Sequence, residues 1–353
     1  MNPSILSLAT ALPEHGGRQE VIVESVIQTL GLQGADAEKC RRIFCRSGIE
    51  HRYTVAQDFL QSPLSGELFG QDYPNRVPGT GRRNELYWRE APKLAEKSAR
   101  KALEQWGGNP EGITHILHAS CTGVMAPGIE FLLTDALGLR RSVVRLGINN
   151  MGCFGAFSVL KVAKAFAREN PKARILAICT ELCSLHFQAD NHPEAFVSNA
   201  LFADGSAAVV VGCEPTADET SLWEIGEHRA LAFEESLDQM TWRAGDTGYL
   251  MTLTEEVPLS IRREIRQFVA GFGDLEGCQW AFHPGGKAIL HGIGMACGLT
   301  KEQLAPSWEV LRKYGNMSSP TFLFVLEELL EKRGPTIGVG FGPGLSMEGL
   351  KLT

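Results

Sequence analysis

The sequence predicts an α/β fold of two similar halves, in which helices pack on both faces of parallel-rich sheets. Buried-strand patterns alternate with helical patterns along the 353 residues, and this alternation is typical of layered α/β folds. A glycine-rich turn, a helix and a buried strand follow one another over residues 152–180, and the same order recurs over residues 315–341. The polar run after residue 214 is the clearest boundary, so we predict two domains, residues 1–214 and 215–353.

The elements of the first half have distinct sequence signals. A short apolar stretch predicts a strand over residues 1–11, and an apolar helical period predicts a helix over residues 18–30. Residues 57–83 are rich in Pro, Gly and Asn and predict a loop, which leads into a helix over residues 84–106. The other predicted elements are a buried strand over 113–120, a helix over 128–138, the end of a buried strand over 142–146, a helix that stops at Asn170-Pro171, and buried strands over 173–180 and 207–212.

The second half repeats this layout. Residues 279–282 predict a buried strand that ends at His283, much as the strand of the first half ends near Cys121. The Gly-Asn-Met-Ser-Ser-Pro run that starts at residue 315 opens a helix, because apolar residues recur behind it at helical spacing. A Gly-Pro pair stops this helix, and a strand over residues 336–341 follows directly.

Composition and charge exclude several classes of function. The formal net charge of -7 argues against nucleic-acid binding, and no apolar run is long enough to span a membrane. The N-terminus lacks the basic start of a secretory signal, so we expect a cytoplasmic protein. The nine cysteines are scattered without a CxxC pair, so we expect free thiols and no metal site.

The stretch from Gly147 to Phe157 is the most informative in the chain. Cys153 follows a predicted strand end and a glycine-rich turn, and it stands at the start of a mostly apolar helix. Unpaired backbone N–H groups and the positive end of the helix dipole stabilise a thiolate at such a place. The small residues Gly152 and Gly155 leave room for a substrate to approach the sulfur. Taken alone, the stretch fits a buried structural cysteine equally well.

Two further residues could complete a nucleophilic site. His283 follows a buried strand, where α/β folds place reactive groups, and Asn316 begins a helix and offers an amide donor. Taken singly, they could be a core histidine and a helix N-cap. Because Cys153 and Asn316 hold matching places in the two halves, a pseudo-twofold axis would bring them to one central site. The combination favours a Cys-His-Asn site.

Four motifs carry a family resemblance. They are GCFGAF around Cys153, WAFHPGGKAIL around His283, YGNMSSP around Asn316 and the closing GFGPG of residues 340–344. In order and spacing they resemble the type III polyketide synthases, which include chalcone synthase, and the likeness covers nearly the whole chain. The resemblance implies a thiolase fold, which is an α/β fold with duplicated αβαβα layered halves and mixed sheets, and a homodimer. The short N-terminus is similar to that of bacterial-type members.

The resemblance also implies a chemistry. Cys153, His283 and Asn316 would form the catalytic triad, with Cys153 carrying the starter acyl group and then the growing chain. His283 and Asn316 would promote decarboxylation of malonyl-CoA and stabilise the enolate. His283 would also keep Cys153 ionised, because an imidazolium and a thiolate favour each other in a closed cavity. The enzyme would be an acyltransferase that takes an acyl-CoA starter and malonyl-CoA as substrates and needs no cofactor.

Further positions carry over as substrate-binding residues. Phe202 matches a gatekeeping phenylalanine between the CoA tunnel and the cavity, whereas Met251 stands where the family has a second gatekeeping phenylalanine. A flexible thioether at that place predicts a wider entrance. Trp242 replaces a glycine of the plant enzymes. The other predicted substrate-binding residues are Cys121, Cys183, His186, Ser318, Gly285, Gly286, Gly342 and Pro343.

A basic segment lies ahead of these motifs. Arg41, Arg42, Arg46 and Arg52 cluster within it without forming one helical stripe. They could be a solvated face, or they could grip the phosphates of an anionic cosubstrate. We predict that Arg46 and Arg52 contact the CoA phosphates.

The predicted reaction is iterative decarboxylative condensation of malonyl-CoA onto an acyl-CoA starter, followed by cyclisation. Met251 favours an aliphatic starter, and the bulk of Trp242 and His186 favours few extensions, which would give an alkylpyrone or alkylresorcinol.

One alternative is a malonyl-primed aromatic synthase of the tetrahydroxynaphthalene synthase kind. Another is a ketoacyl-ACP synthase III-like enzyme, which usually has glutamine after the active-site histidine, where this chain has Pro284. HMG-CoA synthase would need a glutamate base, for which Glu181 is the candidate, and a non-catalytic acyl-binding protein would not need the triad.

Overall fold

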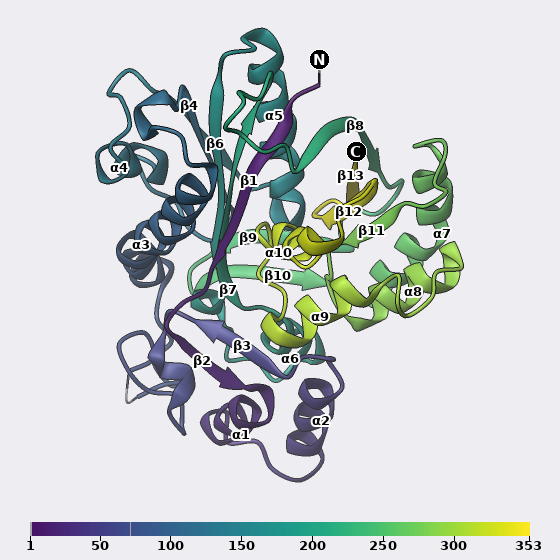
Figure 1. The fold of residues 1–353 in the computed structure, drawn as a ribbon. Coiled ribbons are helices and arrows are strands. Elements are labelled where there is room, and N and C mark those ends of the chain that lie inside the picture. Colours follow the sequence, from purple (N-terminus) through teal and green to yellow (C-terminus); the bar gives the residue numbers. More distant parts are fainter. Residues whose placement is uncertain (1, 71) are drawn as a thin grey trace.

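The computed structural model describes residues 2–70 and 72–353 and has the predicted mixed α/β fold (Figure 1). Positions 1 and 71, which fall in the predicted strand 1–11 and the predicted loop 57–83, lie outside the described residues. The first half contains β1 (Ser4–Ala11), β2 (His15–Arg18), α1 (Gln19–Thr29), α2 (Gly34–Cys45), β3 (His51–Thr54), η1 (Gln57–Leu60), α3 (Thr80–Trp106), η2 (Pro110–Gly112), β4 (His115–Ser120), α4 (Ile129–Ala136), β5 (Val144–Asn149), η3 (Gly152–Phe154), α5 (Gly155–Glu169), β6 (Arg174–Leu182), η4 (Cys183–His186), α6 (Pro193–Leu201) and β7 (Asp204–Gly212). The second half contains β8 (Trp223–Ala232), β9 (Met240–Gly245), β10 (Gly248–Leu253), α7 (Val257–Ala270), β11 (Gln279–Phe282), α8 (Lys287–Cys297), α9 (Ala305–Tyr314), α10 (Thr321–Glu327), η5 (Leu330–Lys332), β12 (Thr336–Gly342) and β13 (Ser346–Leu352).

One large sheet joins the two halves. Within the described residues it has nine strands in the order β11-β12-β13-β8-β1-β7-β6-β4-β5. Strand β4 runs parallel to β5 and β6, and β11 runs parallel to β12, whereas the other neighbouring strands are antiparallel. Within the sheet, the strands of the two halves are joined where Ser4 and Ile5 of β1 pair with β8. The sheet is therefore continuous at a short seam between two mixed parts.

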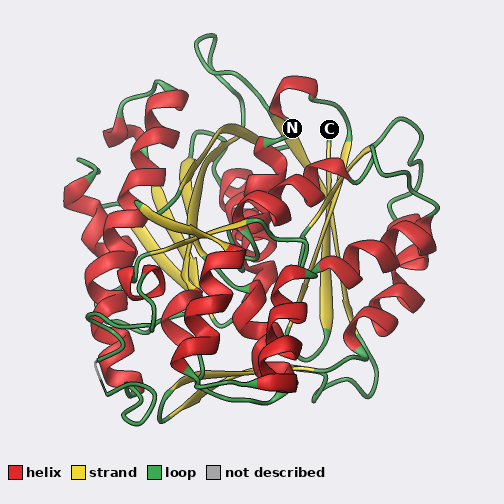
Figure 2. Cartoon of the chain, turned by 90° about the horizontal axis from the view of Figure 1, so that it is seen from below, coloured by secondary structure: helices red, strands yellow, loops and turns green. Residues whose placement is uncertain are grey.

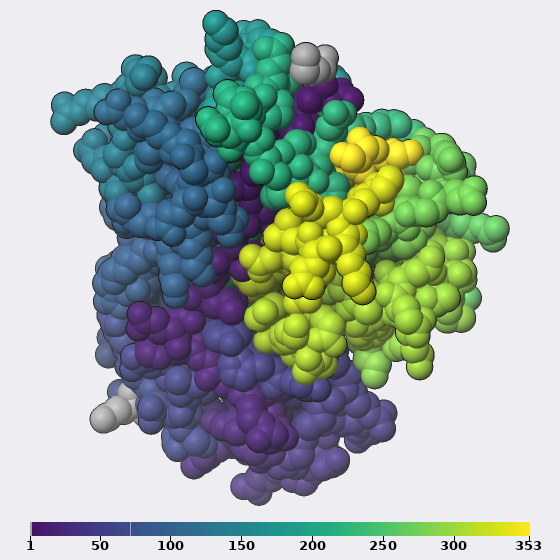
Figure 3. All heavy atoms as spheres, viewed as in Figure 1, coloured from purple at the N-terminus to yellow at the C-terminus, as the bar shows by residue number. Residues whose placement is uncertain are grey.

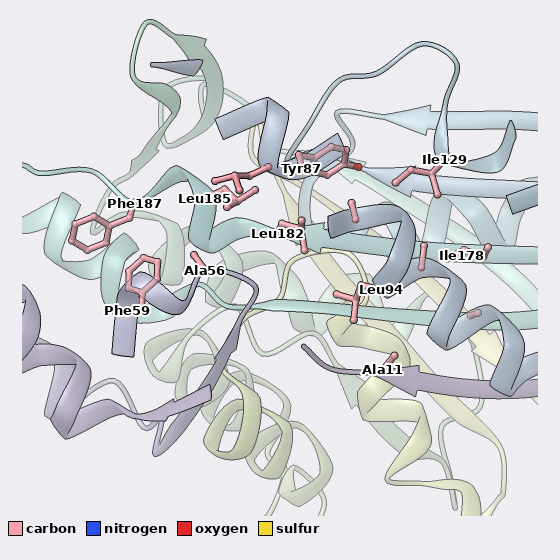
Figure 4. Close-up of a cluster of buried hydrophobic side chains, with 14 of the residues drawn as sticks. Ala11, Ala56, Phe59, Tyr87, Leu94, Ile129, Ile178, Leu182, Leu185 and Phe187 are labelled. Atoms are coloured by element: carbon pink, nitrogen blue, oxygen red, sulfur yellow. The ribbon is translucent and has the colours of Figure 1, made fainter. Parts of the chain in front are cut away.

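Helices cover the sheet outside and lie between its two parts, which gives the layers visible in Figure 2. Helices α5 and α10 form the middle layer, where the Phe157 and Phe322 rings pack with their centroids 4.2 Å apart. These are the two helices that the repeated sequence pattern predicts as partners. An outer core around α3 includes Tyr87 and Leu94, which pack near Leu182 of β6 (Figure 4). In Figure 3 the C-terminal residues, in yellow and light green, gather on one side of the surface.

Two predictions about local structure are wrong. The strand end predicted as buried over residues 142–146 belongs to β5, in which the Val144 side chain is 48% exposed and the Leu146 side chain 38% exposed. Its place at the edge of the sheet explains this, because only β4 pairs with it. The predicted loop over residues 57–83 contains η1 and the first turn of α3. In addition, the basic segment includes helix α2.

Among the described residues, the helices are all too short or too polar to cross a lipid bilayer.

Candidate active site

Cys153 lies in the turn between the edge strand β5 and helix α5. The turn needs two residues with positive φ, namely Asn150 at 63° and Gly152 at 67°. Gly152 also has to be glycine because a Cβ there would collide with the ring of Pro343. The turn leads into η3, which contains Cys153, and α5 continues from it. The sulfur is thus held at the start of a helix whose apolar face, including Phe157, is buried between the two parts of the sheet.

Asn316 is fixed on both sides of its backbone by the segment at the end of α6. Its N–H donates to the Leu201 carbonyl at 2.9 Å, and its carbonyl accepts from the Ala203 N–H at 2.9 Å. The side-chain oxygen Oδ1 accepts from the Ser318 N–H at 2.8 Å. This contact orients the amide nitrogen Nδ2, which lies 3.9 Å from the Cys153 sulfur and 3.5 Å from the Gly285 carbonyl oxygen. The structure therefore brings the predicted nucleophile and the predicted amide donor together.

His283 stands at the end of β11, where its N–H donates to the Val339 carbonyl at 2.8 Å. The side chain is only 1% exposed, and both ring nitrogens have no hydrogen-bond partner among the described residues. Gly285, whose carbonyl accepts from Asn316, also lies next to the imidazole: a Cβ built on Gly285 would be 3.8 Å from Nε2. Gly285 thus lies next to both the His283 imidazole and the Asn316 amide, and both imidazole nitrogens have no partner among the described residues.

Burial controls the protonation of the thiol and of the imidazole. Burial raises the pKa of Cys153 to about 11, hydrogen bonds from Ser318 and Asn316 lower it, and the charge of Glu181 raises it further. Burial lowers the pKa of His283 to about 3. Burial thus favours the neutral thiol and the neutral imidazole in the unliganded protein, in contrast to the predicted ion pair of Cys153 and His283, which stays a prediction.

A small cavity lies against the Cys153 sulfur, and we call it the inner cavity. Its volume is about 20 Å³. It brings seven of the predicted substrate-binding residues to the sulfur, namely Cys121, Cys183, Phe202, Trp242, Met251, Ser318 and Pro343. The sequence did not indicate Thr122 and Met240, which also line it. Since a cavity needs about 10–15 Å³ on this measure to admit one water, the inner cavity is nearly closed.

A second cavity of about 460 Å³ begins on the other side of the same wall, and we call it the outer cavity. The two cavities share Cys183, Phe202, Trp242 and Met251. The predicted substrate-binding residue His186 lines the outer cavity and not the inner one. The apolar residues that line the outer cavity include Ile22, Phe59, Val77, Phe187 and Leu250. The shared residues include Phe202 and Met251, the two positions at which the family resemblance implies a gate.

The side chains of His186, Trp242 and Tyr249 pack against one another at this wall. The His186 imidazole stacks on the Tyr249 ring at 4.5 Å between centroids and meets the Trp242 ring edge-on at 5.4 Å. His186 lies between the Thr122 carbonyl at 2.8 Å and the Tyr249 N–H at 3.0 Å, so Nε2 donates and Nδ1 accepts. Trp242 donates from Nε1 to the Cys121 carbonyl at 2.7 Å. Tyr249 was not among the predicted site residues.

Glu181 is a fully buried charged residue, and the sequence gives little indication that it lies beside the site. Its carboxylate is fully buried and accepts from the hydroxyls of Ser319 at 2.6 Å and Thr122 at 2.7 Å, and from the N–H of Cys121 at 2.9 Å. The Cys121 thiol also donates to it at 3.3 Å and lies 3.5 Å from the Ser318 hydroxyl. Burial raises the pKa of Glu181 and these donors lower it. A charged residue at the end of an apolar strand was the available signal, because such a group needs hydrogen-bond partners.

The prediction that Arg52 holds CoA phosphates disagrees with the structure. Arg52 is only 7% exposed, and it donates to the Gln19 side chain at 2.8 Å and to the carbonyls of Asn199 and Phe202 at 2.7 Å each. Its hydrogen bonds are used inside the protein, where they fix the backbone of the gate residue Phe202. Arg46, in contrast, is exposed at the end of α2.

The remaining predicted positions line neither cavity. Gly342 packs against Phe154 and lies close to the Met151 carbonyl, and Gly286 precedes helix α8. Gly285 acts through its carbonyl, as described above. Among residues 2–70 and 72–353, no cluster of three or more His, Cys, Asp or Glu side chains is placed to hold a metal ion.

Comparisons with known proteins agree with this architecture. The profile "Chalcone and stilbene synthases, N-terminal domain" matches residues 2–215, and the profile "Chalcone and stilbene synthases, C-terminal domain" matches residues 233–353. "Probable polyketide synthase 1" of Dictyostelium discoideum is 32% identical over 362 residues, a match that covers 99% of this chain. The chain spans only 11% of the length of that relative.

Two solved structures are similar over the whole chain. The C-terminal type III polyketide synthase domain of Steely1, a type I/III hybrid from Dictyostelium, is 31% identical and superposes with a TM-score of 0.92, covering 100% of this chain and 99% of that one. PKS-I from the brown alga Ectocarpus siliculosus is 29% identical with a TM-score of 0.93, covering 99% of this chain and 98% of that one.

Proposed function

The chain belongs to the chalcone and stilbene synthase family of type III polyketide synthases, and from this premise we propose that it condenses malonyl-CoA repeatedly onto an acyl-CoA starter. The observation that carries the proposal is the Cys153 thiol, which lines the inner cavity and lies 3.9 Å from the Asn316 amide nitrogen; Asn316 and His283 do not themselves line that cavity. A thiol nucleophile, an amide donor and an imidazole with free nitrogens are the groups that acyl transfer needs. The protein would then be an acyltransferase whose substrates are CoA thioesters, with no further cofactor.

In the loading step, the Cys153 sulfur attacks the carbonyl carbon of the starter thioester. His283 accepts the thiol proton and returns it to the CoA sulfur when the bond between carbonyl carbon and CoA breaks. The acyl group ends as a thioester on Cys153, and CoA leaves as the thiol. A neutral imidazole suits this step, because the low pKa of His283 leaves it unprotonated at neutral pH.

In the extension step, malonyl-CoA loses CO₂ and its thioester oxygen takes up negative charge. The Asn316 amide and the His283 imidazole donate to that oxygen and stabilise the enolate. The enolate carbon attacks the acyl carbonyl on Cys153, the bond to the Cys153 sulfur breaks, and the chain, longer by two carbons, is attached to CoA. Transfer back to Cys153 begins the next cycle. The Ser318 N–H supports this step because it fixes the direction of the Asn316 amide.

We also propose an aliphatic starter, because of the outer cavity. An acyl chain on Cys153 can reach this cavity only past the wall that contains Phe202 and Met251. Met251 has a flexible thioether that can move aside for an alkyl chain. The volume of about 460 Å³ and the aliphatic and aromatic lining residues suit such a chain. A nearly closed inner cavity favours few extensions, which would give an alkylpyrone or alkylresorcinol after cyclisation.

The size of the inner cavity also favours a second candidate. At about 20 Å³ it is only slightly larger than one water, so the smallest acyl group needs the least movement of its walls. Malonyl-CoA supplies the acetyl-sized group that would fit, so a malonyl-primed aromatic product of the tetrahydroxynaphthalene kind is the alternative. In that case the outer cavity would not hold a starter.

Mass spectrometry of products from a panel of acyl-CoA starters of graded length decides between these candidates. The purified protein is incubated with malonyl-CoA and each starter, and with malonyl-CoA alone as the control. We expect pyrones or phenols that retain the starter chain, with the highest kcat/KM for medium or long chains. An aromatic product from malonyl-CoA alone would support the alternative. Condensation that requires acyl-ACP would contradict both.

We further propose that a second copy of the chain covers the edge strand β5. Val144 and Leu146 of β5 are exposed beside Phe131 and Leu132 of α4, which are 54% and 40% exposed. Arg145 lies over the Phe131 ring at 5.7 Å, so strand and helix form one surface. An apolar patch on an open sheet edge is a template for pairing with another chain. Light scattering should show a dimer, and Leu146→Lys should shift it toward monomer, whereas Arg168→Lys on the polar face of α5 should not.

A further inference from the structure

The hairpin formed by β9 and β10 contributes two of the four residues that line both cavities, and the other two are Cys183 and Phe202. Trp242 and Met251 are direct cross-strand partners in this hairpin, so their side chains lie on the same face. Both line the inner and the outer cavity. The position of one two-stranded hairpin therefore decides the size of the inner cavity and the opening toward the outer one.

The hairpin is not part of the nine-stranded sheet. Within the described residues it is a separate sheet of two strands, and an isolated two-stranded sheet is marginally stable by itself. Its base is held by the Gly344 N–H, which donates to the Met240 carbonyl at 2.9 Å. Its middle is held by the Trp242 hydrogen bond to Cys121 and by the Tyr249 N–H, which donates to His186. Contacts with other elements thus determine where the hairpin lies.

Thr80 holds the tip of the hairpin. Its N–H donates to the Asp246 carbonyl at 2.8 Å, and its hydroxyl accepts from the Gly248 N–H at 2.8 Å. The same hydroxyl donates to the Gly245 carbonyl. Gln188 adds two longer contacts, because its side-chain nitrogen donates to the Thr247 carbonyl at 3.1 Å and its side-chain oxygen accepts from the Thr247 hydroxyl at 3.3 Å. The Thr80 hydroxyl therefore joins both ends of the turn at once.

Thr80 connects the hairpin to the long helix α3. It is the first residue of α3, a helix of 27 residues that packs on β1, β6 and β7. It is not among the residues that line the inner or the outer cavity. The opposite wall of the inner cavity, with Cys121, Cys153 and Ser318, is buried at the ends of core elements. When a growing chain needs more space than about 20 Å³, the hairpin is the wall that can move.

We propose that Thr80 is a positioning residue that clamps the hairpin tip to α3 and so limits how many malonyl units are added. The inference rests on the proposed function, because chain length has meaning only for a polyketide synthase. A clamp that holds Trp242 near the Cys153 sulfur keeps the inner cavity small. Loss of the clamp lets the hairpin move outward and gives the chain more room.

The test compares Thr80→Val, which keeps the shape of the side chain but removes the hydroxyl, with the conservative Thr80→Ser. Hydrogen exchange followed by mass spectrometry reports on peptides from residues 240–253. We expect exchange in this region to be about fivefold faster or more in Thr80→Val, because two hydrogen bonds are lost there. Exchange in α5 and the melting temperature should stay close to the wild-type values, and Thr80→Ser should behave as wild type.

The second measurement is the product distribution from one aliphatic acyl-CoA and malonyl-CoA. Thr80→Val should shift the mean product by at least one malonyl unit, whereas malonyl-CoA decarboxylation should change by less than about twofold, since the reacting groups are untouched. Thr80→Ser should restore the wild-type distribution. Unchanged hairpin exchange in Thr80→Val, or faster exchange with wild-type products, overturns the proposal. If the wild-type protein forms no polyketide, the proposed function fails, and the exchange data still decide whether Thr80 holds the hairpin.

Discussion

The inner and outer cavities share one wall but are built in different ways. The inner cavity is formed on one side by turns at the ends of core elements, where Cys121, Cys153 and Ser318 are each at most 8% exposed, and also by Met240, Trp242 and Met251 of the hairpin. The outer cavity is formed largely by the hairpin, η4 and α6, and its rim includes the exposed residues Asp190 and His192. The comparison indicates that core elements fix the predicted catalytic groups, whereas the predicted choice of substrate depends on the hairpin, η4 and α6.

The two cavities also differ in their electrostatics. Inside, burial raises the pKa of Cys153 and lowers the pKa of His283, so it favours the neutral forms of these predicted catalytic groups. His186, on the outer side of the wall, is neutral for the same reason, because burial lowers its pKa to about 4. At the rim, polar groups face water. A substitution in the inner cavity should therefore lower activity with every substrate. A substitution in the wall should instead change the preference among substrates.

The largest effect is expected for Cys153→Ala. Polyketide formation should fall by a factor of about 1,000 or more with every starter, because no other residue receives the acyl group. Malonyl-CoA decarboxylation should persist, since His283 and Asn316 remain. Product assays and CO₂ release on the same preparation check this, with circular dichroism to show that the fold is kept. Substantial polyketide output would remove Cys153 from the role of nucleophile.

The second prediction concerns the pH dependence of thiol reactivity. The folded pKa of Cys153 lies above that of a free thiol, about 8.5, so the thiol stays protonated where a free one ionises. Its alkylation by iodoacetamide should be more than about tenfold slower at pH 8 than that of the exposed Cys45, and it should accelerate only at higher pH. Peptide mapping by mass spectrometry reads both sites in one sample. An inflection for Cys153 at or below the free-thiol value would show that the unliganded site already contains a thiolate.

The third prediction uses Met251→Phe to test whether long starters depend on the outer cavity and short ones do not. A rigid ring in the wall should lower kcat/KM for long acyl-CoA starters by more than about tenfold, because one lost methylene contact alone is worth about 1 kcal/mol. Acetyl-CoA and malonyl-CoA should be affected much less, as they do not need the outer cavity. Steady-state kinetics with the graded starter panel measures this. Equal losses for long and short starters would make Met251 a packing residue.

The smallest effect is expected for Trp242→Phe. The substitution removes the hydrogen bond from Nε1 to the Cys121 carbonyl at 2.7 Å and keeps an aromatic ring in the wall. The free energy of unfolding should fall by about 1–2 kcal/mol, since a part-buried carbonyl loses its partner. The mean number of extensions should rise slightly, with little change in starter preference. Denaturant titration and product analysis check the two effects, and a change in starter preference without a change in chain length would reverse the roles assigned to Trp242 and Met251.

Local sequence signals account for much of what was predicted correctly. The glycine-rich turn before an apolar helix placed Cys153 at a helix start, and the strand pattern before His283 placed that residue at a strand end. These signals work because turns, caps and periodicity depend on neighbours within a few residues. The motif resemblance added the family, which the comparisons confirm. The catalytic roles of Cys153, His283 and Asn316 stay predictions, as do the bacterial-type assignment and the cytoplasmic location.

Tertiary structure decided the properties that depend on distant contacts. Arg52 belongs to a basic segment in the sequence, yet it is used to hold carbonyls near Phe202, about 150 positions away. The apolar pattern of β5 predicted burial, but only the order of strands shows that it is an open edge.

Within the site, the sequence by itself determined which chemical groups the chain carries and at which element ends they stand. The tertiary structure decided that burial raises the pKa of the Cys153 thiol, that the inner cavity is only about 20 Å³, and that the hairpin lining it is hydrogen-bonded to Thr80. The physical reason is that desolvation and cavity volume are sums over atoms from both halves. No short stretch of sequence contains those atoms together.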